Sequence, residues 1–406
     1  MAEFVSISGS LVIFAALYFE VFLLISLFER KKSPLPPADY TPPVTVIIPV
    51  YNEQGTVEST LESLFALDYP QEHLSIIVVN DGSTDGTAAV LEKYKNNPQI
   101  RIFSKENGGK YTALNFGIEK STTAYIGCLD ADSFVEKHAL RRIMSRFAES
   151  SVMAVTPSMI IDKPKGLIRH MQKAEYNFGN FMRKALSLIG AIHITPGPFS
   201  FFRREVFDTI GLYKHAHNTE DMEMAMRMQK NKMRIANATD ALVYTVGPGS
   251  IGKLYKQRVR WVSGFIGNLI DYRDMLFSKQ FGDLGLLVLP FSVFGMVMTF
   301  IFISISIYKF IGNLTEAIVR YSTVGFAAPK ITFDWFYLNT SILSILSMMF
   351  VALIIALSLY GERTASGKWR FSMSVLYFTF LYSFIAPFWL LTSIYNNVFS
   401  KEASWR

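Results

Sequence analysis

The sequence of 406 residues contains one cysteine, Cys128. A single cysteine excludes a disulfide bond within the chain. Cys128 lies in the apolar run 124–129, and a free cysteine packs as a small hydrophobic residue. We therefore expect Cys128 to be buried in a strand and not to act as a nucleophile.

The first apolar run, residues 9–28, lacks the features of a signal peptide. No basic segment precedes it, and no small-residue cleavage site separates it from the charged residues that begin at Glu29. The sequence predicts a retained membrane anchor here.

Hydrophobic residues make up 50% of the chain, and the mean hydropathy of +0.25 is high for a soluble enzyme. They concentrate in four runs, at residues 9–28, 286–308, 336–360 and 373–395. Each run has about 18 residues or more with few charges, which is enough to cross a hydrocarbon core of about 30 Å. The sequence predicts about four transmembrane helices.

The net charge of +7 is not gathered on a basic stripe of the kind that binds nucleic acid. Much of it flanks the apolar runs, at Arg30, Lys31, Lys32, Lys253, Lys256, Arg258, Arg260, Arg363, Lys368 and Arg370. The positive-inside rule places these flanks in the cytoplasm. We expect a multi-pass protein of the cell membrane with residues 30–285 and 361–371 inside. Residues 309–335 and both termini would lie outside.

The segment between residues 42 and 250 alternates short apolar runs with polar turns. Three β-branched runs are typical of strands in a parallel sheet that is covered on both faces: 44–50, 74–80 and 124–129. Helical patterns lie between them, at about 54–67, 84–95 and 110–120. This alternation predicts a doubly wound, Rossmann-like α/β layer. Ligands of such sheets bind at the carboxyl ends of the strands.

The remaining segments differ in character. Residues 34–43 form a Pro-rich linker. Residues 251–281 carry apolar, basic and Trp side chains at helical spacing, which suits an amphipathic helix at the membrane interface. A helix packed on the sheet would show the same spacing. The expected parts are a membrane helix at 1–33, the α/β domain at 34–250, the interface helix at 251–281 and a membrane domain at 282–406.

Carboxylates follow two of the predicted strands. Asp130 and Asp132 come directly after 124–129 with D-x-D spacing, and Asp81 follows 74–80. A hard divalent cation takes oxygen ligands, and such an ion offsets the charge that develops on a leaving diphosphate. A lone D-x-D pair is common by chance, so its weight comes from its position at the ligand-binding edge. Asp81 could cap a helix instead, but its place at the end of the strand favours a role facing the ligand.

Thr219, Glu220 and Asp221 precede a helical pattern at 222–230. A threonine N-cap followed by two acids stabilises the start of a helix. A catalytic base needs a carboxylate near an acceptor hydroxyl, and Asp221 is the candidate. The two interpretations are compatible, because a capped helix start also fixes the carboxylate.

Gln257 and Trp261 share one face of the predicted interface helix, with Arg260 one step round. Arginine can bind a diphosphate with two parallel hydrogen bonds, and tryptophan offers a flat apolar face to a sugar ring. A belt of Trp and Arg at the membrane interface is the simpler alternative.

Taken in order, these motifs resemble a known family. Asp81, Asp130-Ala131-Asp132, Thr219-Glu220-Asp221 and Gln257-x-x-Arg260-Trp261 resemble the D, D-x-D, TED and Q-x-x-R-W pattern of the processive family 2 glycosyltransferases. That family includes cellulose, hyaluronan, chitin and poly-N-acetylglucosamine synthases. The segments 48–53 and 107–110 also resemble it, so the likeness covers about residues 42–270.

The resemblance implies a GT-A fold and an inverting, direct-displacement transfer. By motif match, the nucleotide would be held by Tyr51, Glu53, Asp81 and Lys110. Asp132 would ligate Mg²⁺ or Mn²⁺, and Asp130 would contact the nucleotide sugar. The catalytic motif would be Thr219, Glu220 and Asp221, with Asp221 as the base. The diphosphate and acceptor site would be lined by Gln257, Arg260 and Trp261.

The sequence departs from the family in two respects. No gating-loop motif of the cellulose-synthase type follows Trp261, and four spans are fewer than many polymer-secreting members have. Both departures put in doubt an export channel formed by this chain alone. A homo-oligomer or an accessory membrane subunit could complete one.

Three functions remain open from the sequence. The first is a processive synthase that extends a glycan acceptor from a nucleotide-diphospho-sugar, with UDP-N-acetylglucosamine as the first choice of donor and UDP-glucose as the second. The second is a nonprocessive enzyme that adds one sugar to a lipid carrier or glycolipid. The third is a transporter or channel with a regulatory nucleotide-binding domain. Four spans with an almost charge-free interior argue against the third.

Overall fold

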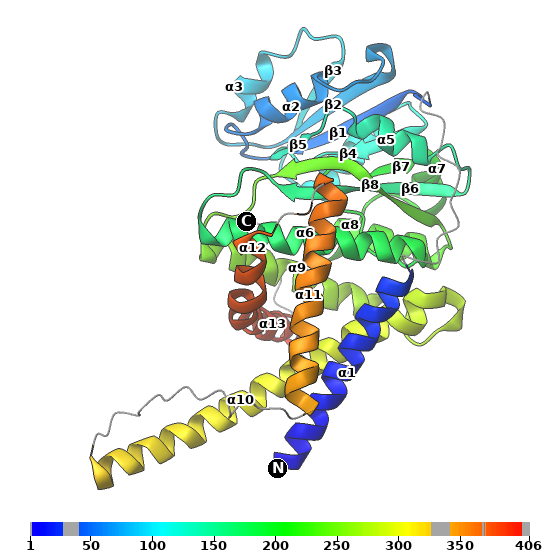
Figure 1. The fold of residues 1–406 in the computed structure, drawn as a ribbon. Helices are drawn as coiled ribbons and strands as arrows, with labels where there is room; N and C mark the ends of the chain where they lie inside the picture. The colour runs from blue at the N-terminus through cyan, green and yellow to red at the C-terminus, as the bar shows by residue number, and fades with distance from the viewer. Residues whose placement is uncertain (1, 27–39, 326–341, 368, 370, 400–406) are drawn as a thin grey trace.

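A computed structural model describes residues 2–26, 40–325, 342–367, 369 and 371–399. Its centre is an eight-stranded sheet in the order β3-β2-β1-β4-β7-β6-β8-β5 (Figure 1). The strands are β1 Val44–Val50, β2 Leu74–Asp81, β3 Ile100–Lys105, β4 Tyr125–Cys128, β5 Ser133–Val135, β6 Val152–Ile161, β7 Phe201–Arg203 and β8 Arg234–Thr245. The three strands predicted from the sequence are β1, β2 and β4.

The sheet is parallel in its first half and mixed in its second. β3, β2, β1 and β4 pair in parallel, whereas β7 runs antiparallel to both β4 and β6. β6 pairs with β8 in parallel, and β5 closes the edge antiparallel to β8. The expected doubly wound parallel layer therefore holds for β1 to β4, and a mixed extension follows it.

Helices cover both faces of this sheet. They are α2 Val57–Phe65, α3 Thr87–Glu92, α4 Lys110–Lys120, α5 Ala139–Arg146, α6 Gly166–Leu188, α7 Arg204–Ile210 and α8 Glu220–Lys230. In β1, Ile47 packs in one buried cluster with residues of α4, while Val46 and Ile48 pack in the other with residues of α2. A strand covered on both faces has no polar side, which is why β1 reads as a continuous apolar run.

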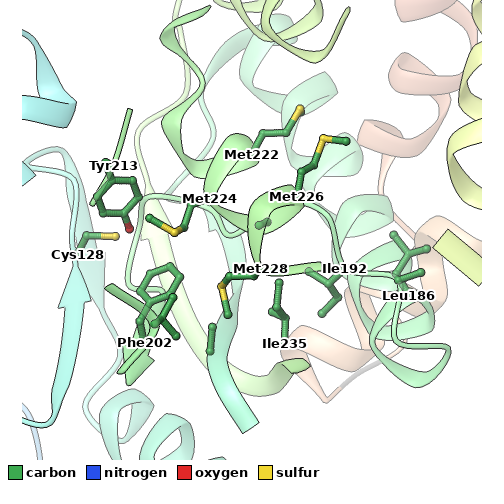
Figure 2. Packing of buried hydrophobic residues seen from close by; sticks show 14 of the residues in the cluster. Cys128, Leu186, Ile192, Phe202, Tyr213, Met222, Met224, Met226, Met228 and Ile235 are labelled. Carbon is green, nitrogen blue, oxygen red and sulfur yellow. The ribbon is translucent and has the colours of Figure 1, made fainter. Parts of the chain in front are cut away.

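Helix α8 is held by the larger of the two clusters (Figure 2). Met222, Met224, Met226 and Met228 are all buried, so the helix has almost no apolar side chain facing water. Cys128 on β4 lies opposite Tyr213 in the same cluster and is 5% exposed. Burial raises the pKa of its thiol to about 12. Cys128 is a buried strand residue, as expected.

The remaining elements lie below the sheet in Figure 1. They are α1 Ala2–Ser26, α9 Ile251–Asp271, α10 Leu289–Val324, α11 Ile342–Ser366, α12 Met373–Leu376 and α13 Ser383–Val398. Short turns join them: Arg273–Met275, Lys279–Phe281, the π-helical Leu284–Val288 and the π-helical Tyr377–Tyr382. The predicted interface helix at 251–281 is therefore α9 followed by two short turns.

Within the described residues, fewer membrane spans are found than the four predicted. By length and composition, Leu284–Thr323 and Ser344–Thr364 can cross a membrane. The expected span at 373–395 is instead a pair, Met373–Tyr382 and Phe384–Val398, bent by 49°. This pair adds a third span only if its two helices are counted together as one span. At the N-terminus the apolar stretch within the described part of α1, Ile13–Ile25, is shorter than a span. Residues 27–39 and 326–341 lie outside the described residues. They include parts of the expected spans at 9–28 and 336–360 and of the expected linker at 34–43.

Candidate active site

A cavity of about 600 Å³ opens between the sheet and α9. One wall comes from the carboxyl ends of β1 and β4, with Tyr51, Glu53, Asp130 and Asp132, as the topology of the sheet predicts. The opposite wall carries Lys253, Lys256, Gln257 and Arg260 of α9, together with Arg169 of α6. The lining is completed by residues 246–249, between β8 and α9, and by Pro49, Lys110 and Ala131.

Lys110 joins two of the predicted motifs. It is the first residue of α4, and its Nζ lies 2.7 Å from Asp130 Oδ1 and 3.2 Å from Glu220 Oε1. Burial acts to lower the pKa of Lys110, but the charges of Asp130, Glu220 and Asp221 outweigh it and raise the pKa. Lys110 therefore remains a cation, and it holds the D-x-D segment against the start of α8.

Two carboxyl groups beside this ion pair are hard to ionise. Burial raises the pKa of Asp132 to about 6, and the charges of Asp130 and Glu53 add to the effect. Burial also raises the pKa of Asp221 to about 6, with the charge of Glu220 acting in the same direction. Lys110 acts against both shifts. An aspartate with a pKa near 6 can accept a proton at neutral pH more readily than an exposed one.

The donor set suits a hard cation that is shared with a ligand. Asp130, Asp132 and Glu53 present oxygen atoms, and their mutual repulsion is one cause of the raised pKa of Asp132. Within the described residues, no three His, Cys, Asp or Glu side chains converge into a metal cage. The protein would thus supply a small part of the coordination sphere and leave the rest to phosphate and water, which is how Mg²⁺ is usually held.

Thr219 stands at the N-cap position of α8, but its side chain does not cap the helix. Its hydroxyl donates to the carbonyl of Ala216 at 3.0 Å, and its own carbonyl accepts from the backbone N–H of Met222 at 3.1 Å. The expected side-chain cap is therefore wrong. Instead, the Asp221 carboxylate accepts a hydrogen bond from the Met222 N–H at 2.9 Å.

The Q-x-x-R-W residues do not share one environment. Gln257 and Arg260 line the cavity, whereas Trp261 is not among the residues that line it. Trp261 packs against Arg258, whose guanidinium carbon is 4.2 Å from the ring centre. Arg258 is buried and bonds to Glu175 of α6 and to the Tyr382 hydroxyl. From the sequence, Arg258 was expected to flank a membrane span. In the structure it links α9 to α6 and to the bent helical pair at 373–398.

Asp81 is buried beside the cavity and is not among the residues that line it. Its Oδ1 accepts from Lys105 Nζ at 2.6 Å and from the Gly108 N–H at 3.1 Å, and its Oδ2 accepts from the Gly109 N–H at 2.9 Å. In this arrangement Asp81 fixes the loop that leads into α4. The loop in turn sets the position of Lys110.

Sequence reasoning missed several residues of the site. Lys253 and Lys256 were expected to flank the membrane, yet they line the cavity with Gln257 and Arg260. The spacing i, i+3, i+4, i+7 on one helix was a usable signal. Gly197 gave no such signal. A Cβ at Gly197 would lie 2.6 Å from Lys110 Nζ and 2.9 Å from Asp130 Oδ1, so a larger residue here would displace this ion pair.

The chain is similar to known proteins of one family. A family model described as "Glycosyl transferase family 2" matches residues 45–211. A poly-beta-1,6-N-acetyl-D-glucosamine synthase of Staphylococcus epidermidis is 30% identical over 296 residues, which cover 72% of this chain and 70% of that protein. The chain belongs to glycosyl transferase family 2. It is a glycosyltransferase, and the family expected from its motifs is confirmed.

Two further comparisons are with a second relative and with a solved structure. A synthase of the same description from Staphylococcus aureus strain MSSA476 is 31% identical, over 69% of each protein. A mannosyltransferase from Pyrobaculum calidifontis, solved in complex with GDP-Man and Mn²⁺, shares the fold with a TM-score of 0.66. It is 20% identical and covers 99% of this chain and 100% of its own. The likeness extends past the α/β domain into the helices below it.

Proposed function

We propose that this family 2 glycosyltransferase is an inverting polysaccharide synthase of the cell membrane. It takes N-acetylglucosamine from UDP-N-acetylglucosamine and adds it to the end of a growing glycan. The choice of sugar follows the two staphylococcal relatives, which are described as poly-beta-1,6-N-acetyl-D-glucosamine synthases. The α/β domain within residues 34–250 faces the cytoplasm, α9 lies at the interface, and residues 282–406 form the membrane part.

One observation carries the catalytic part of the proposal. Lys110 holds the D-x-D segment and the start of α8 together at one cavity, within 2.7 Å of Asp130 and 3.2 Å of Glu220. A donor whose diphosphate lies near Asp130 and Asp132 therefore places its sugar beside Asp221. Arg260 and the two lysines of α9 supply positive charge on the opposite wall, which suits a diphosphate.

The transfer then runs as a single displacement. Asp221 takes the proton of the acceptor hydroxyl, and the oxygen of that hydroxyl bonds to the anomeric carbon of the sugar. The bond from that carbon to the diphosphate oxygen breaks, and the electron pair leaves with the UDP. Lys110 and Arg260 stabilise the charge on the departing diphosphate. Attack opposite to the leaving group inverts the configuration.

A divalent cation fits the carboxylates described above. Asp132 is the candidate ligand for Mg²⁺ or Mn²⁺, and Asp130 is the candidate contact to the nucleotide sugar. When bound, the ion would offset the negative charge of the diphosphate. The repulsion between Asp132, Asp130 and Glu53 would be relieved at the same time.

Incubation of the purified full chain in detergent with a panel of UDP-sugars tests the proposal. We expect UDP release with UDP-N-acetylglucosamine in the presence of Mg²⁺ or Mn²⁺, and a product of many residues on sizing by gel filtration. UDP-glucose serves as the competing donor. A product extended by one sugar would point to the nonprocessive enzyme. Absence of UDP release with every donor tested would contradict the proposal.

A further inference from the structure

The turn that leads into the TED motif has an unusual backbone. Ala216, His217 and Asn218 have φ values of 45°, 55° and 60°. Three successive non-glycine residues in the left-handed region are strained, and such a conformation persists only when surrounding groups hold it. Thr219, Glu220 and Asp221 follow directly, so whatever holds the turn also sets the position of Asp221.

Helix α9 supplies the hydrogen bonds to this turn. Arg260 Nη1 donates to the carbonyl of Asn218 at 3.0 Å. About two and three turns further along the helix, Asn268 Nδ2 donates to the Thr219 hydroxyl at 2.8 Å, and Asp271 Oδ2 lies 3.0 Å from His217 Nε2. These three residues of α9 are spaced by eight and then three positions, which places them on one face of the helix.

Between these bonds, two glycines let the turn approach α9 closely. A Cβ at Gly264 would lie 2.3 Å from both Cγ2 and Oγ1 of Thr219. A Cβ at Gly267 would lie 2.7 Å from Cδ2 of His217. Real Cβ atoms do not come this near to other heavy atoms, so an alanine at either position must displace the side chain that it meets, the turn or the helix.

The other side of α9 is fixed by α13. Ser393 Oγ donates to the carbonyl of Val259 at 3.2 Å, and Asn397 Nδ2 donates to the carbonyl of Ser263 at 3.2 Å. The hydroxyls of Tyr255 and Thr392 are 2.6 Å apart. Helix α9 therefore lies between the last apolar helix of the chain and the turn that carries the TED motif.

We propose that α9 positions the base: through Gly264, Gly267, Asn268 and Asp271 it holds the strained turn 216–218 so that Asp221 faces the acceptor. This inference rests on the proposed role of Asp221. It assigns positioning roles to residues that follow the Q-x-x-R-W motif and do not line the cavity. It also implies that α13 affects the catalytic centre, because a shift of α13 would move α9 and hence the turn.

The test uses two alanine substitutions on the same helix. Gly264→Ala adds one methyl group against Thr219, whereas Gly252→Ala adds one where nothing lies within 4 Å. We expect Gly264→Ala to lower kcat on the order of 10- to 100-fold, the cost of a small misplacement of a catalytic group. Its affinity for UDP should stay within about twofold of the wild-type value, because the metal and nucleotide side of the cavity is untouched. Gly252→Ala should match the wild-type protein in both measurements.

Two results would overturn the inference. One is a wild-type kcat for Gly264→Ala; the other is a loss of UDP affinity as large as the loss of kcat, which indicates general disruption. If Gly264→Ala does not fold, Asn268→Ala decides, because it removes the bond to Thr219 without adding bulk. A lower kcat with UDP affinity retained then supports the inference, and an unchanged kcat contradicts it.

Asp221→Asn, measured beside these variants, separates the two proposals. An active Asp221→Asn protein removes Asp221 from the role of base, and the proposed function fails at that step. An inactive Asp221→Asn protein together with a fully active Gly264→Ala protein leaves the base in place and refutes only the positioning role of α9.

Discussion

Arg258 covers one face of Trp261, with its guanidinium carbon 4.2 Å from the ring centre. Arg258 is itself 3% exposed and is bonded to Glu175 and Tyr382. One face of the indole ring is thus occupied, and only the other remains for a sugar. The same contact ties the ring to the junction between α6, α9 and the last apolar pair.

Trp261→Ala should impair elongation more than donor hydrolysis. A glycan needs a surface to pack on, whereas water does not. We expect polymer formation to fall by about tenfold, which corresponds to ~1.4 kcal/mol and is within the range of a desolvated cation–π and stacking contact. The measurement is UDP release against polymer formed in the same reaction.

Trp261→Phe is the matched control, since it retains a ring beside Arg258. It should keep most of the polymer formation. Equal losses of UDP release and polymer in Trp261→Ala would instead make Trp261 a general support of the site. If neither changes, Trp261 is an interfacial anchor.

The strands β1, β2 and β4 were predictable because burial on both faces leaves an unbroken apolar run. β5 and β7 have three residues each, too few to show any period, so these two strands were not predicted. The pairing of Lys110 with Asp130 and Glu220 spans 20 and 110 positions of the chain, and no local pattern encodes it. Motif resemblance found these residues, and only the fold shows that they meet.

The membrane part was predicted less well for a different reason. Hydropathy measures how many apolar residues stand in a row, but not whether the helix that they form is straight. The run at 373–395 contains Pro387 within α13 and a π-helical turn before it, and the pair is bent by 49°. In the same way, the sequence showed that Lys253 and Lys256 are basic, but not that they face a cavity.

Lys110→Met should destabilise the protein and move its pH–rate profile. Removing the cation leaves Asp130 and Glu220 with an uncompensated charge in a partly buried site, which costs on the order of 3–5 kcal/mol. Lys110 also lowers the pKa of Asp132 and Asp221, so the acidic limb of the profile should shift to higher pH. Thermal unfolding and kcat against pH are the measurements.

Lys110→Arg retains the charge and is the control for Lys110→Met. Its acidic limb should stay near that of the wild-type enzyme. If the acidic limb of the pH–rate profile lies at the same pH in Lys110→Met and in the wild-type enzyme, the effect of Lys110 on the pKa values of Asp132 and Asp221 is refuted.

Asp132→Ala should weaken the binding of UDP only when metal is present. A diphosphate without its cation must be bound against its own charge. We expect the Kd for UDP with Mn²⁺ to rise on the order of tenfold or more, the usual effect of damaging a metal site. With a chelator present, the variant and the wild-type protein should bind UDP equally. Wild-type protein that binds UDP as well with chelator as with Mn²⁺ would show that the metal assignment is wrong.

Activity should fall as the pH drops below about 6. The pKa values of Asp221 and Asp132 are both raised to about 6 by burial and by neighbouring carboxylates. Each group is needed in its ionised form, so protonation removes activity. A saturating cation would keep Asp132 ionised, and a single titration, that of Asp221, should then remain. Measuring kcat from pH 5 to 8 at low and at saturating Mn²⁺ distinguishes the titration of Asp132 from that of Asp221. A kcat that does not change over this range would contradict the roles of both residues.

Asp221→Asn should abolish transfer, preserve donor binding and stabilise the protein at neutral pH. Loss of a general base costs typically 10²- to 10⁴-fold in rate, while the groups placed to bind UDP remain. The stability effect follows from the sign of the shift in pKa. Asp221 has a pKa of about 6 in the folded chain, against 3.8 for an aspartate in water, so its contribution to stability is present below pH 3.8 and is lost as the pH rises through 6.

At pH 7.5 the ionised Asp221 therefore opposes folding, by an amount on the order of 1–3 kcal/mol, and an asparagine removes that cost. Thermal unfolding of both proteins at pH 7.5 and at pH 5 measures it: the variant should have the higher Tm at pH 7.5, and the gap should narrow at pH 5, where the wild-type carboxyl is protonated. Binding of UDP with Mn²⁺ is the control for an intact site. A variant that is inactive but less stable than the wild-type protein at pH 7.5 would mean that the Asp221 carboxylate also supports the fold, through its bond to the Met222 N–H, and that its burial is not a cost borne for catalysis.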